Sequence, residues 1–203
     1  IIDPYFSASK LLWLIENDAE IRRAVDTGSA RFGTIDTWLL WNLTEDRVYA
    51  TDHTNASRTL FLNLATMDWD PWLRTRWRLQ GLNLPPIHPC AYAYGETDFL
   101  GVLPRRVPIS AMIGDSHAAA FGEGCVSPGA AKTTLGTGSS ILMNVGGERV
   151  DSRSGMMSTI CWSVPNRTDH ALEGIIVCCG STITWMRDQL GLFSDSRQTE
   201  ELA

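Results

Sequence analysis

Four features that would assign the chain to common functional classes are missing from its 203 residues. No apolar run approaches the ~20 residues that a membrane-spanning helix needs, so we expect no membrane span. Basic residues do not predominate, since 17 Lys and Arg stand against 23 Asp and Glu and give a net charge of −6. A nucleic-acid-binding module is expected to carry a basic stripe, so we expect no nucleic-acid partner.

The first residues also lack the marks of a secretory signal. Ile1-Ile2-Asp3-Pro4-Tyr5 has neither a basic region nor a long apolar region. The stretch does not begin with Met, and we expect the chain to be part of a longer protein. An apolar content of 44% and a charged content of 20% are ordinary for a soluble globular protein. The length suffices for one large or two small domains.

Cysteine pairs suited to a disulfide framework or a zinc site are absent as well. The chain has five cysteines, an odd number, and no two are spaced as Cys-x-x-Cys. Free thiols are typical of a reducing compartment, so we expect a cytoplasmic location. Cys178 and Cys179 are adjacent and could act as a redox pair. The preference of cysteine for burial favours instead two small apolar residues in a buried strand.

The first third of the chain has the pattern of short helices. Ser7 or Ser9 is positioned to cap a helix that runs through an apolar stretch, and Asp18 to cap a second helix. Asp36 is expected to cap a third, very apolar helix over 38–43. Hydrophobic residues lie on all sides of this helix, which is typical of a buried element.

Polar residues dominate the stretch 52–59, which lies between apolar segments. The stretch is either a loop near a ligand or a turn of Asn, Asp, Ser and Thr bonded to itself, and the second interpretation is favoured. Asp70-Pro71 predicts the start of another helix, because proline suits the first helical position, and Gly81 predicts its end. Residues 92–95 predict the end of a strand.

After Gly124 the pattern changes from helices to strands. Glycine and proline turns separate four apolar runs, over residues 130–135, 139–145, 156–164 and 170–177. We expect these runs to form an antiparallel meander, followed by a helix over 183–190. The change predicts a domain boundary near Gly124, with one domain in residues 1–124 and a second beginning in 125–203.

Asp115 stands between an apolar run, 107–113, that predicts a strand and a run of small residues that predicts a helix. A carboxylate there can accept a proton from a substrate hydroxyl, or it can cap the following helix. Taken alone, the dipeptide Gly114-Asp115 favours the cap. His117 is a weaker candidate, because one histidine inside a helix is more often a hydrogen-bonded side chain than a base.

Two glycine turns follow that are suited to an anion. Gly136-Thr137-Gly138 separates two expected strands, and its N–H groups and the Thr137 hydroxyl can point at a phosphate. A plain hairpin turn explains the same glycines. Gly180-Ser181-Thr182 opens a helix whose free N–H groups and dipole suit an anion or a nucleotide, although a simple tight turn is equally compatible. Neither turn is a P-loop, since the Lys-Ser/Thr ending is missing.

Together these residues resemble the FGGY family of carbohydrate kinases, and within it the members that phosphorylate glycerol. The resemblance runs from the first residue to about Leu192. The matching stretches are Asp3-Pro4-Tyr5-Phe6-Ser7, continued by Lys10-Leu11-x-Trp13-Leu14-x-Glu16-Asn17, then Phe32-Gly33-Thr34-Ile35-Asp36-Thr37-Trp38-Leu39, Thr54-Asn55-Ala56-Ser57-Arg58-Thr59, Gly136-Thr137-Gly138 and Ala171-Leu172-Glu173-Gly174.

The resemblance implies an α/β fold, the central portion of a two-domain kinase of actin-like, ribonuclease-H-like architecture. It implies phosphoryl transfer from ATP, with Mg²⁺, to a hydroxyl of a small polyol, most readily glycerol. Asp115 would be the catalytic base and would face Mg²⁺ through a water, and this role now outweighs the cap. The acceptor would contact Tyr5, Asp115, Ser116 and Ser140. The nucleotide would lie against Gly136, Thr137, Gly138, Gly180, Ile183 and Thr184.

Two residues depart from the pattern of the family. Members that phosphorylate glycerol usually place glutamine where Ser116 stands and an aromatic residue where Ser140 stands. Both positions face the substrate in the family. Their replacement by serine predicts a larger and more polar pocket, so a longer polyol or sugar, such as erythritol, a pentitol or a ketopentose, stays open beside glycerol.

A second class of function is open as well. The same nucleotide-binding fold serves chaperones and actin-like filaments, and a degenerate copy would be a non-catalytic nucleotide-binding regulator. Asp115 favours the catalytic function, because a protein that only binds a nucleotide needs no general base. The first phosphate hairpin of the family, its acceptor-gripping Arg-Glu pair and its adenine-binding glycines have no counterpart here. We therefore expect the isolated chain to be inactive. Separately, we expect the full-length enzyme to be a homo-oligomer.

Overall fold

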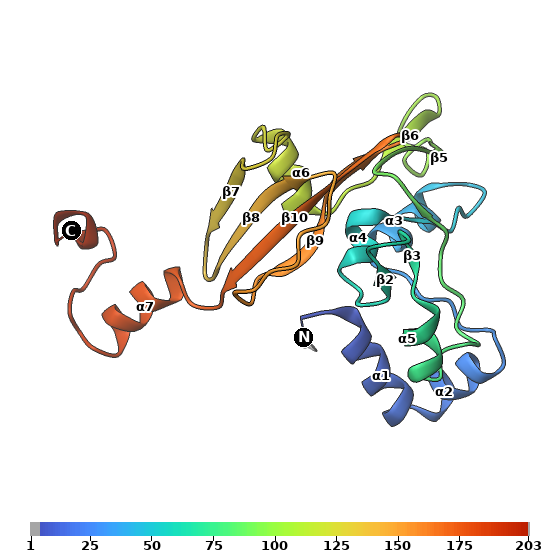
Figure 1. Ribbon diagram of the computed structural model, residues 1–203, viewed down its shortest axis with the longest axis horizontal. Coiled ribbons are helices and arrows are strands. Elements are labelled where there is room, and N and C mark those ends of the chain that lie inside the picture. The colour runs from blue at the N-terminus through green and yellow to red at the C-terminus, as the bar shows by residue number, and fades with distance from the viewer. Residues whose placement is uncertain (1–4, 203) are drawn as a thin grey trace.

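The computed structural model describes residues 5–202. Asp3 and Pro4, which begin the first stretch that matches the family, therefore lie outside the described residues. A helix-rich part, a four-stranded sheet and an extended end follow one another along the chain (Figure 1). The helices are α1 Ser7–Asn17, α2 Ala19–Asp26, α3 Ile35–Leu43, α4 His53–Ser57, α5 Pro71–Arg76, α6 Asp115–Gly122, α7 Gly180–Asp188 and α8 Gln198–Leu202. The strands are β1 Thr51–Asp52, β2 Leu62–Asn63, β3 Asp68–Trp69, β4 Ile87–His88, β5 Ala91–Thr97, β6 Val107–Ala111, β7 Ala131–Leu135, β8 Ser139–Gly146, β9 Met157–Val164 and β10 Arg167–Ile176.

The caps of the first two helices differ from each other. Asp18 caps α2 as predicted, since its side chain accepts hydrogen bonds from the N–H groups of Glu20 and Ile21. The predicted serine cap of α1 is wrong. The helix already begins at Ser7, its N-cap residue is Phe6, and no side chain caps it. The Ser9 hydroxyl donates instead to the Phe6 carbonyl at 3.1 Å.

Helix α3 contradicts two expectations. Thr34, not Asp36, is its N-cap residue, because Asp36 lies in the first helical turn. The helix is also not buried on all sides, since only Thr37 and Leu40 are buried while Trp38 is 61% exposed. Only the side of α3 that carries Leu40 packs on a core cluster, with Ala50 and Tyr94. The remaining apolar residues stay on the surface because no described element covers them.

The polar stretch 52–59 is bonded to itself, as the favoured interpretation states, but it forms a helix rather than a turn. The Asp52 carboxylate caps α4 by accepting from the N–H groups of Thr54 and Asn55, at 2.7 and 3.1 Å. It also accepts from the Thr54 hydroxyl and the Asn55 amide at 2.6 Å each. Asp52 is fully buried, and these four bonds replace the water that it loses on folding.

The segment that leads to the sheet has two shifted boundaries. Pro71 begins α5 as predicted, but the helix ends at Arg76 rather than near Gly81. Arg78 has a φ of 54°, which an α-helix cannot continue through. Residues 92–95 lie inside β5 rather than at a strand end. The strand pairs with β6 in antiparallel register, with an irregularity between Ala91 and Gly95.

The four expected strands after Gly124 form one antiparallel sheet, but not a meander. The order is β7-β8-β10-β9, so β10 lies between β8 and β9. Glu173 of β10 is therefore opposite Leu142 of β8 and Met157 of β9. β9 and β10 each have a continuous run of five buried residues, while β7 has one buried residue. The two strands with the longest buried runs therefore pair directly, and the run in β10 includes Asp169, His170 and Glu173.

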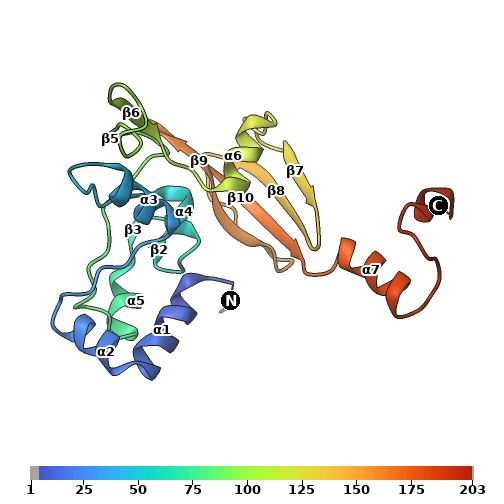
Figure 2. The same cartoon turned by 180° about the vertical axis from the view of Figure 1, so that it is seen from behind.

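Helix α6 joins the helix-rich part to the sheet (Figure 2). It packs against β9 and β7, and one core cluster includes Ala120 of α6 together with Leu142, Trp162 and Ala171 of the sheet. Helix α4 also packs against β9. The predicted domain boundary near Gly124 falls between α6 and β7, and the division into two domains stays a prediction.

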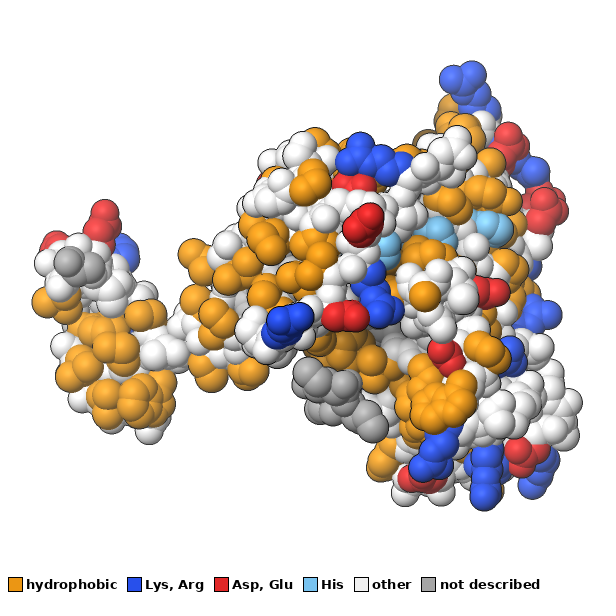
Figure 3. Space-filling model, in the orientation of Figure 1, with side chains coloured by type: hydrophobic (Ala, Val, Ile, Leu, Met, Phe, Trp, Pro, Cys, Tyr) orange, Lys and Arg blue, Asp and Glu red, His pale blue; other side chains and the backbone are white. Residues whose placement is uncertain are grey.

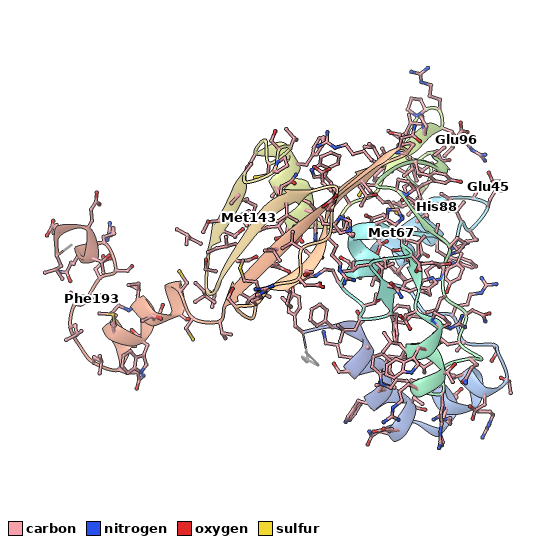
Figure 4. All side chains as sticks on the ribbon, in the orientation of Figure 1. Glu45, Met67, His88, Glu96, Met143 and Phe193 are labelled. Carbon is pink, nitrogen blue, oxygen red and sulfur yellow. The ribbon has the colours of Figure 1, made fainter. Side chains whose placement is uncertain are left out.

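The end of the chain extends away from the sheet. None of the residues of α7 is buried, and Figure 3 shows hydrophobic side chains gathered on this lobe. Phe193 lies beyond α7, far from Met143 of the sheet (Figure 4).

The prediction that Cys178 and Cys179 lie in a buried strand is wrong. β10 ends at Ile176, Cys178 is exposed, and all five cysteines are free.

Candidate active site

Asp115 is the first residue of α6, four residues after the end of β6. The alternative interpretation as an N-cap is wrong, because the N-cap residue is Gly114 and no side chain caps the helix. One Asp115 carboxylate oxygen accepts the N–H of Ser116 at 2.6 Å, and the residue is exposed. Its negative charge is placed favourably at the positive end of a helix, and the carboxylate remains accessible to a ligand.

Asp115 lies at a cavity of about 390 Å³ between α3, α4 and α6. Three of the predicted acceptor residues, Tyr5, Asp115 and Ser116, line this cavity together. The other lining residues are Ile35, Asp36, Leu39, Asn55, Arg58, Ile113, Gly114, His117 and Glu173. The exposed apolar residues at the start of α3 therefore form one wall of the cavity.

A second cavity of about 540 Å³ shares Tyr5, Ser116 and Glu173 with the first. Ser140 and Gly138 line it, so the fourth predicted acceptor residue lies next to the other three. The Ser140 hydroxyl donates to a Glu173 carboxylate oxygen at 3.3 Å. The two cavities together bring all four predicted acceptor residues to one place.

Two charged residues that sequence reasoning did not assign to the site form a bridge across it. Arg58, at the end of α4, pairs with Glu173 of β10 at 2.5 Å, and the Glu173 side chain is only 4% exposed. The guanidinium of Arg58 also lies 5.0 Å from the centre of the Tyr5 ring. The negative charge of Glu173 was a signal that could have indicated this pair. Glu173 stands in a buried strand, and a buried charge needs a partner.

Lys132 of β7 is a third residue that sequence reasoning missed. It is 5% exposed, and its ammonium donates to the carbonyl and the hydroxyl of Ser116 at 3.2 and 3.1 Å. Ser116 follows Asp115 directly. Lys132 therefore holds the backbone next to the carboxylate and places a positive charge beside the cavity.

His117 is not the hydrogen-bonded side chain that the sequence favours. It is 3% exposed, and neither ring nitrogen has a hydrogen-bond partner among the described residues. The pKa of His117 is lowered to about 4, chiefly by burial and in addition by the positive charges of Arg58 and Lys132, while Asp115 acts in the opposite direction. The imidazole is therefore neutral at pH 7.

This burial predicts a loss of stability in acid. In the unfolded chain His117 takes up its proton near pH 6.5, whereas in the folded chain it does so only near pH 4. The unfolded state therefore binds more protons between these values, and stability falls as the pH falls from 6.5 to 4. The difference amounts to about 3 kcal/mol in the free energy of unfolding.

Urea unfolding of the intact protein at pH 7 and pH 4 measures this effect. The His117→Gln variant, which has no titrating ring, is expected to lose about 3 kcal/mol less than the natural protein between the two pH values. An equal loss in both proteins would contradict the assignment of this titration to His117.

The Gly136-Thr137-Gly138 turn joins β7 to β8, and the start of α7 packs directly against it. A Cβ on Gly138 would lie 2.8 Å from the carbonyl oxygen of Ile176, so this glycine permits the close approach of the end of β10. The expected free N–H groups of α7 are in use. The Gly180 N–H donates to the Gly136 carbonyl at 2.8 Å, and the Ser181 N–H to the Thr137 carbonyl at 3.2 Å.

A third cavity, of about 470 Å³, lies where α7 meets this turn. Three of the predicted nucleotide residues, Thr137, Gly180 and Thr184, line it together with Ser181, Trp185, Asp188 and Gln189. Gly138 instead faces the 540 Å³ cavity, so the turn separates the acceptor side from this third cavity. Gly136 contributes its carbonyl to the contact with Gly180, and Ile183 is half-buried and lines none of the three cavities.

The contact between the turn and α7 gives a further prediction. A Cβ on Gly180 would lie 2.7 Å from the Gly136 carbonyl oxygen, a backbone atom that cannot move without moving the turn. We expect Gly180→Ala to shift the turn and weaken nucleotide binding about tenfold or more. Gly122→Ala is the matched control, because nothing lies within 4 Å of its added Cβ. Titration of both variants with ATP measures the effect, and equal affinities would contradict it.

Comparisons with known proteins support the resemblance. Residues 1–122 match the family model described as the N-terminal domain of the FGGY family of carbohydrate kinases. The chain belongs to the FGGY family of carbohydrate kinases. The Symbiobacterium thermophilum glycerol kinase is 43% identical over 203 residues, and glycerol kinase 2 of Thermotoga maritima is 42% identical over 205. Each match covers 100% of the chain and 41% of the relative, so the chain spans well under half of these kinases.

Solved structures agree with this assignment. The Plasmodium falciparum glycerol kinase with ADP superposes with a TM-score of 0.90 at 35% identity, over 98% of this FGGY chain and 40% of the other. A xylulose kinase from Rhodospirillum rubrum gives a TM-score of 0.80 at 19% identity, over 97% and 39%, which supports the fold alone. The predicted α/β, actin-like and ribonuclease-H-like fold class of an FGGY kinase is confirmed.

Proposed function

We propose that the intact protein transfers a phosphoryl group from ATP to a hydroxyl of a small polyol, with glycerol as the first candidate. The observation that carries the proposal is the accessible Asp115 carboxylate in a cavity that also contains Tyr5 and Ser116. Identity above 40% to two glycerol kinases supports glycerol as the acceptor. The similarity to a glycerol kinase that was solved with ADP supports ATP as the donor.

In this proposal the acceptor lies against Tyr5, Asp115, Ser116 and Ser140. Asp115 accepts the proton of the attacking hydroxyl, and typical losses on removal of such a base are ~10²–10⁴-fold. The Lys132 ammonium holds Ser116 and keeps the backbone beside the base in place. Positioning of the two reactants supplies much of the remaining acceleration, because the transferred group needs little covalent help from the protein.

The nucleotide is proposed to lie at Gly136, Thr137, Gly138, Gly180, Ile183 and Thr184. The third cavity supports this assignment, since Thr137, Gly180 and Thr184 line it. The Thr184 hydroxyl donates to the Gly180 carbonyl at 3.4 Å. The Gly180 and Ser181 N–H groups are bonded to the turn, so α7 acts by holding the turn rather than by binding phosphate through these two donors. Neither the Thr137 nor the Gly138 N–H is bonded to another backbone carbonyl in residues 5–202, and both are available to a phosphate oxygen.

Mg²⁺ belongs to the proposal as the partner of the ATP phosphates. In the described part of the chain no group of three or more His, Cys, Asp or Glu side chains could hold a metal ion. Mg²⁺ in kinases is usually held by one or two carboxylates, substrate phosphates and water, and a single exposed carboxylate at Asp115 fits that arrangement through a water. When bound, the ion neutralises charge on the transferred group.

No helix in residues 5–202 is long and apolar enough to cross a membrane. The cytoplasmic location, the homo-oligomeric state and the absence of a nucleic-acid partner stay predictions. The proposed reaction needs a small-molecule acceptor, ATP and Mg²⁺.

A coupled ADP-release assay on the intact protein tests the function. The acceptor panel contains glycerol, erythritol and the pentitols, and mass spectrometry identifies the phosphorylated product. We expect the highest kcat/KM with glycerol. A higher kcat/KM with a four- or five-carbon polyol would move the acceptor class to longer polyols, and ATP binding without any acceptor-dependent turnover would contradict the function.

A further inference from the structure

A hydrogen bond between two distant segments holds the backbone just before Asp115. The N–H of Gly114 donates to the Thr54 hydroxyl at 2.8 Å, across 60 positions of the chain. Thr54 lies in α4, and Gly114 is the N-cap residue of α6, which begins at Asp115. Helix α4 therefore contacts the segment that carries the proposed base, although Thr54 lines none of the three cavities described above.

The Thr54 hydroxyl is itself fixed by the Asp52 carboxylate. It donates to one carboxylate oxygen at 2.6 Å, and the Thr54 N–H donates to the same oxygen at 2.7 Å. The Cys90 thiol donates to that oxygen as well, at 3.2 Å. The pKa of this thiol is raised to about 12, chiefly by burial, so the thiol keeps its proton. Because the single proton of the Thr54 hydroxyl goes to Asp52, an oxygen lone pair is left to accept the Gly114 N–H.

The Asp52 end of this chain of bonds is excluded from water. Asp52 and Thr54 are fully buried, and Cys90 is 6% exposed. Hydrogen bonds in such a place meet no competition from water, and a group that loses its partner there stays unpaired. In residues 5–202 the Thr54 hydroxyl is also the only hydrogen-bond partner of the Gly114 N–H. The contact therefore has no ready substitute.

The Asp115 carboxylate depends on this backbone for its position. In residues 5–202 the one hydrogen bond of its side chain is to the N–H of its own neighbour, Ser116. An aspartate side chain is short, so the carboxylate follows the backbone that carries it. Lys132 of β7 holds that backbone on the Ser116 side, and Thr54 of α4 holds it on the Gly114 side. The sheet and the helix-rich part thus each hold one side of the base.

The packing around Gly114 shows how closely the two segments approach. A Cβ on Gly114 would lie 2.9 Å from Nδ1 of His117 and 3.6 Å from the hydroxyl oxygen of Thr54. The glycine backbone therefore lies close to both the imidazole ring and the threonine. A shift of the threonine contact would move the backbone directly before the base.

We propose that Thr54 is a positioning residue whose hydroxyl fixes the backbone at Gly114 and so holds the Asp115 carboxylate in place for the acceptor hydroxyl. Asp52 orients the threonine hydroxyl for this role. The inference rests on the proposed function and deepens it, because it names the residues that hold the base. Thr54 acts only through Asp115, so its contribution belongs to turnover and not to the affinity for ATP.

The test compares Thr54→Val with Thr54→Ser in the intact protein. Valine has nearly the same shape as threonine but no hydroxyl, whereas serine keeps the hydroxyl and loses only a methyl group. We expect Thr54→Val to lower kcat by about 10- to 100-fold with little change in the KM for ATP, because misplacement of a catalytic group by ~1 Å can cost ~10²-fold. Thr54→Ser should retain most of the turnover. An unchanged kcat in Thr54→Val would overturn the positioning role.

Thr59→Val is the matched control. Thr59 is also fully buried, and its hydroxyl donates to the Ala56 carbonyl at 2.7 Å and accepts the Phe61 N–H at 3.0 Å. Each valine variant loses one donor and one acceptor, so both should lower the urea midpoint to a similar extent. Only Thr54→Val should lower kcat. An equal fall of kcat in the two variants would assign the effect to general loss of stability and overturn the positioning role.

A double-mutant cycle with Asp115→Asn shows whether Thr54 acts through the base. No base is left to misplace in Asp115→Asn, so adding Thr54→Val should lower the residual rate by less than about twofold. The same fold loss in both backgrounds would overturn the positioning role and leave the proposed function in place. Absence of any polyol-dependent turnover in the natural protein would instead overturn the proposed function together with the positioning role.

Discussion

Replacement of Asp115 by Asn is expected to reduce polyol-dependent turnover of the intact protein by about 10²–10⁴-fold. Asparagine has nearly the same shape and can still accept the Ser116 N–H bond at the start of α6, which is 2.6 Å long in the natural protein. It cannot take a proton from a hydroxyl. The loss should therefore appear in kcat, with the affinity for ATP retained, because the third cavity is built from other residues.

Asp18→Asn is the matched control for this change. Asp18 also stands at a helix N-terminus, where it accepts the N–H groups of Glu20 and Ile21, and asparagine is an equally good cap. The control should keep full turnover. Near-normal turnover in Asp115→Asn, measured under the same conditions by ADP release, would show that Asp115 is not the base.

The second large effect concerns the Arg58–Glu173 pair, which links α4 to the middle of the sheet. The Glu173 side chain is 4% exposed and that of Arg58 is 17% exposed, so the pair is largely removed from water. Removing one partner leaves the other charge buried and uncompensated. We expect Glu173→Leu to lower the free energy of unfolding by about 3–5 kcal/mol.

The double variant Arg58→Met, Glu173→Leu tests the cause of that loss. Replacing both charges with apolar residues removes the unpaired charge, so the double variant should be more stable than Glu173→Leu alone. Arg149–Asp151 is an exposed pair, with side chains 43% and 74% exposed, and Asp151→Leu should cost no more than about 1 kcal/mol. Urea unfolding measures all three variants. A double variant no more stable than Glu173→Leu would contradict the mechanism.

Some local signals in the sequence predicted local structure correctly, whereas others, such as the serine cap of α1 and the Asp36 cap of α3, did not. The Asp18 cap, Pro71 at a helix start and the four strands after Gly124 each depend on neighbouring residues, and each is present. The order of the strands was not predictable in the same way. A meander is the simplest arrangement of four consecutive strands, whereas in the order β7-β8-β10-β9 the last strand lies between β8 and β9, beside the other strand with a long buried run.

In the candidate active site, too, the residues that belong to local motifs were predicted and the contacts between distant residues were not. Asp115, Ser116 and Tyr5 were predicted from a resemblance of short motifs, and the fold brings them to one cavity. The bridge between Arg58 and Glu173 joins residues 115 positions apart, so no local pattern could indicate it. The unpartnered ring of His117 was also unpredictable, because one histidine in a helix carries no sign of its partners.

The most direct test of the central claim is the initial rate of ADP formation by the intact protein with Mg²⁺ and saturating ATP as the glycerol concentration is raised. A rate that rises hyperbolically with glycerol and yields phosphorylated glycerol is the predicted result. A rate that stays at its acceptor-free value with every polyol of the panel, while ATP still binds, would contradict the account and identify a nucleotide-binding protein without kinase activity.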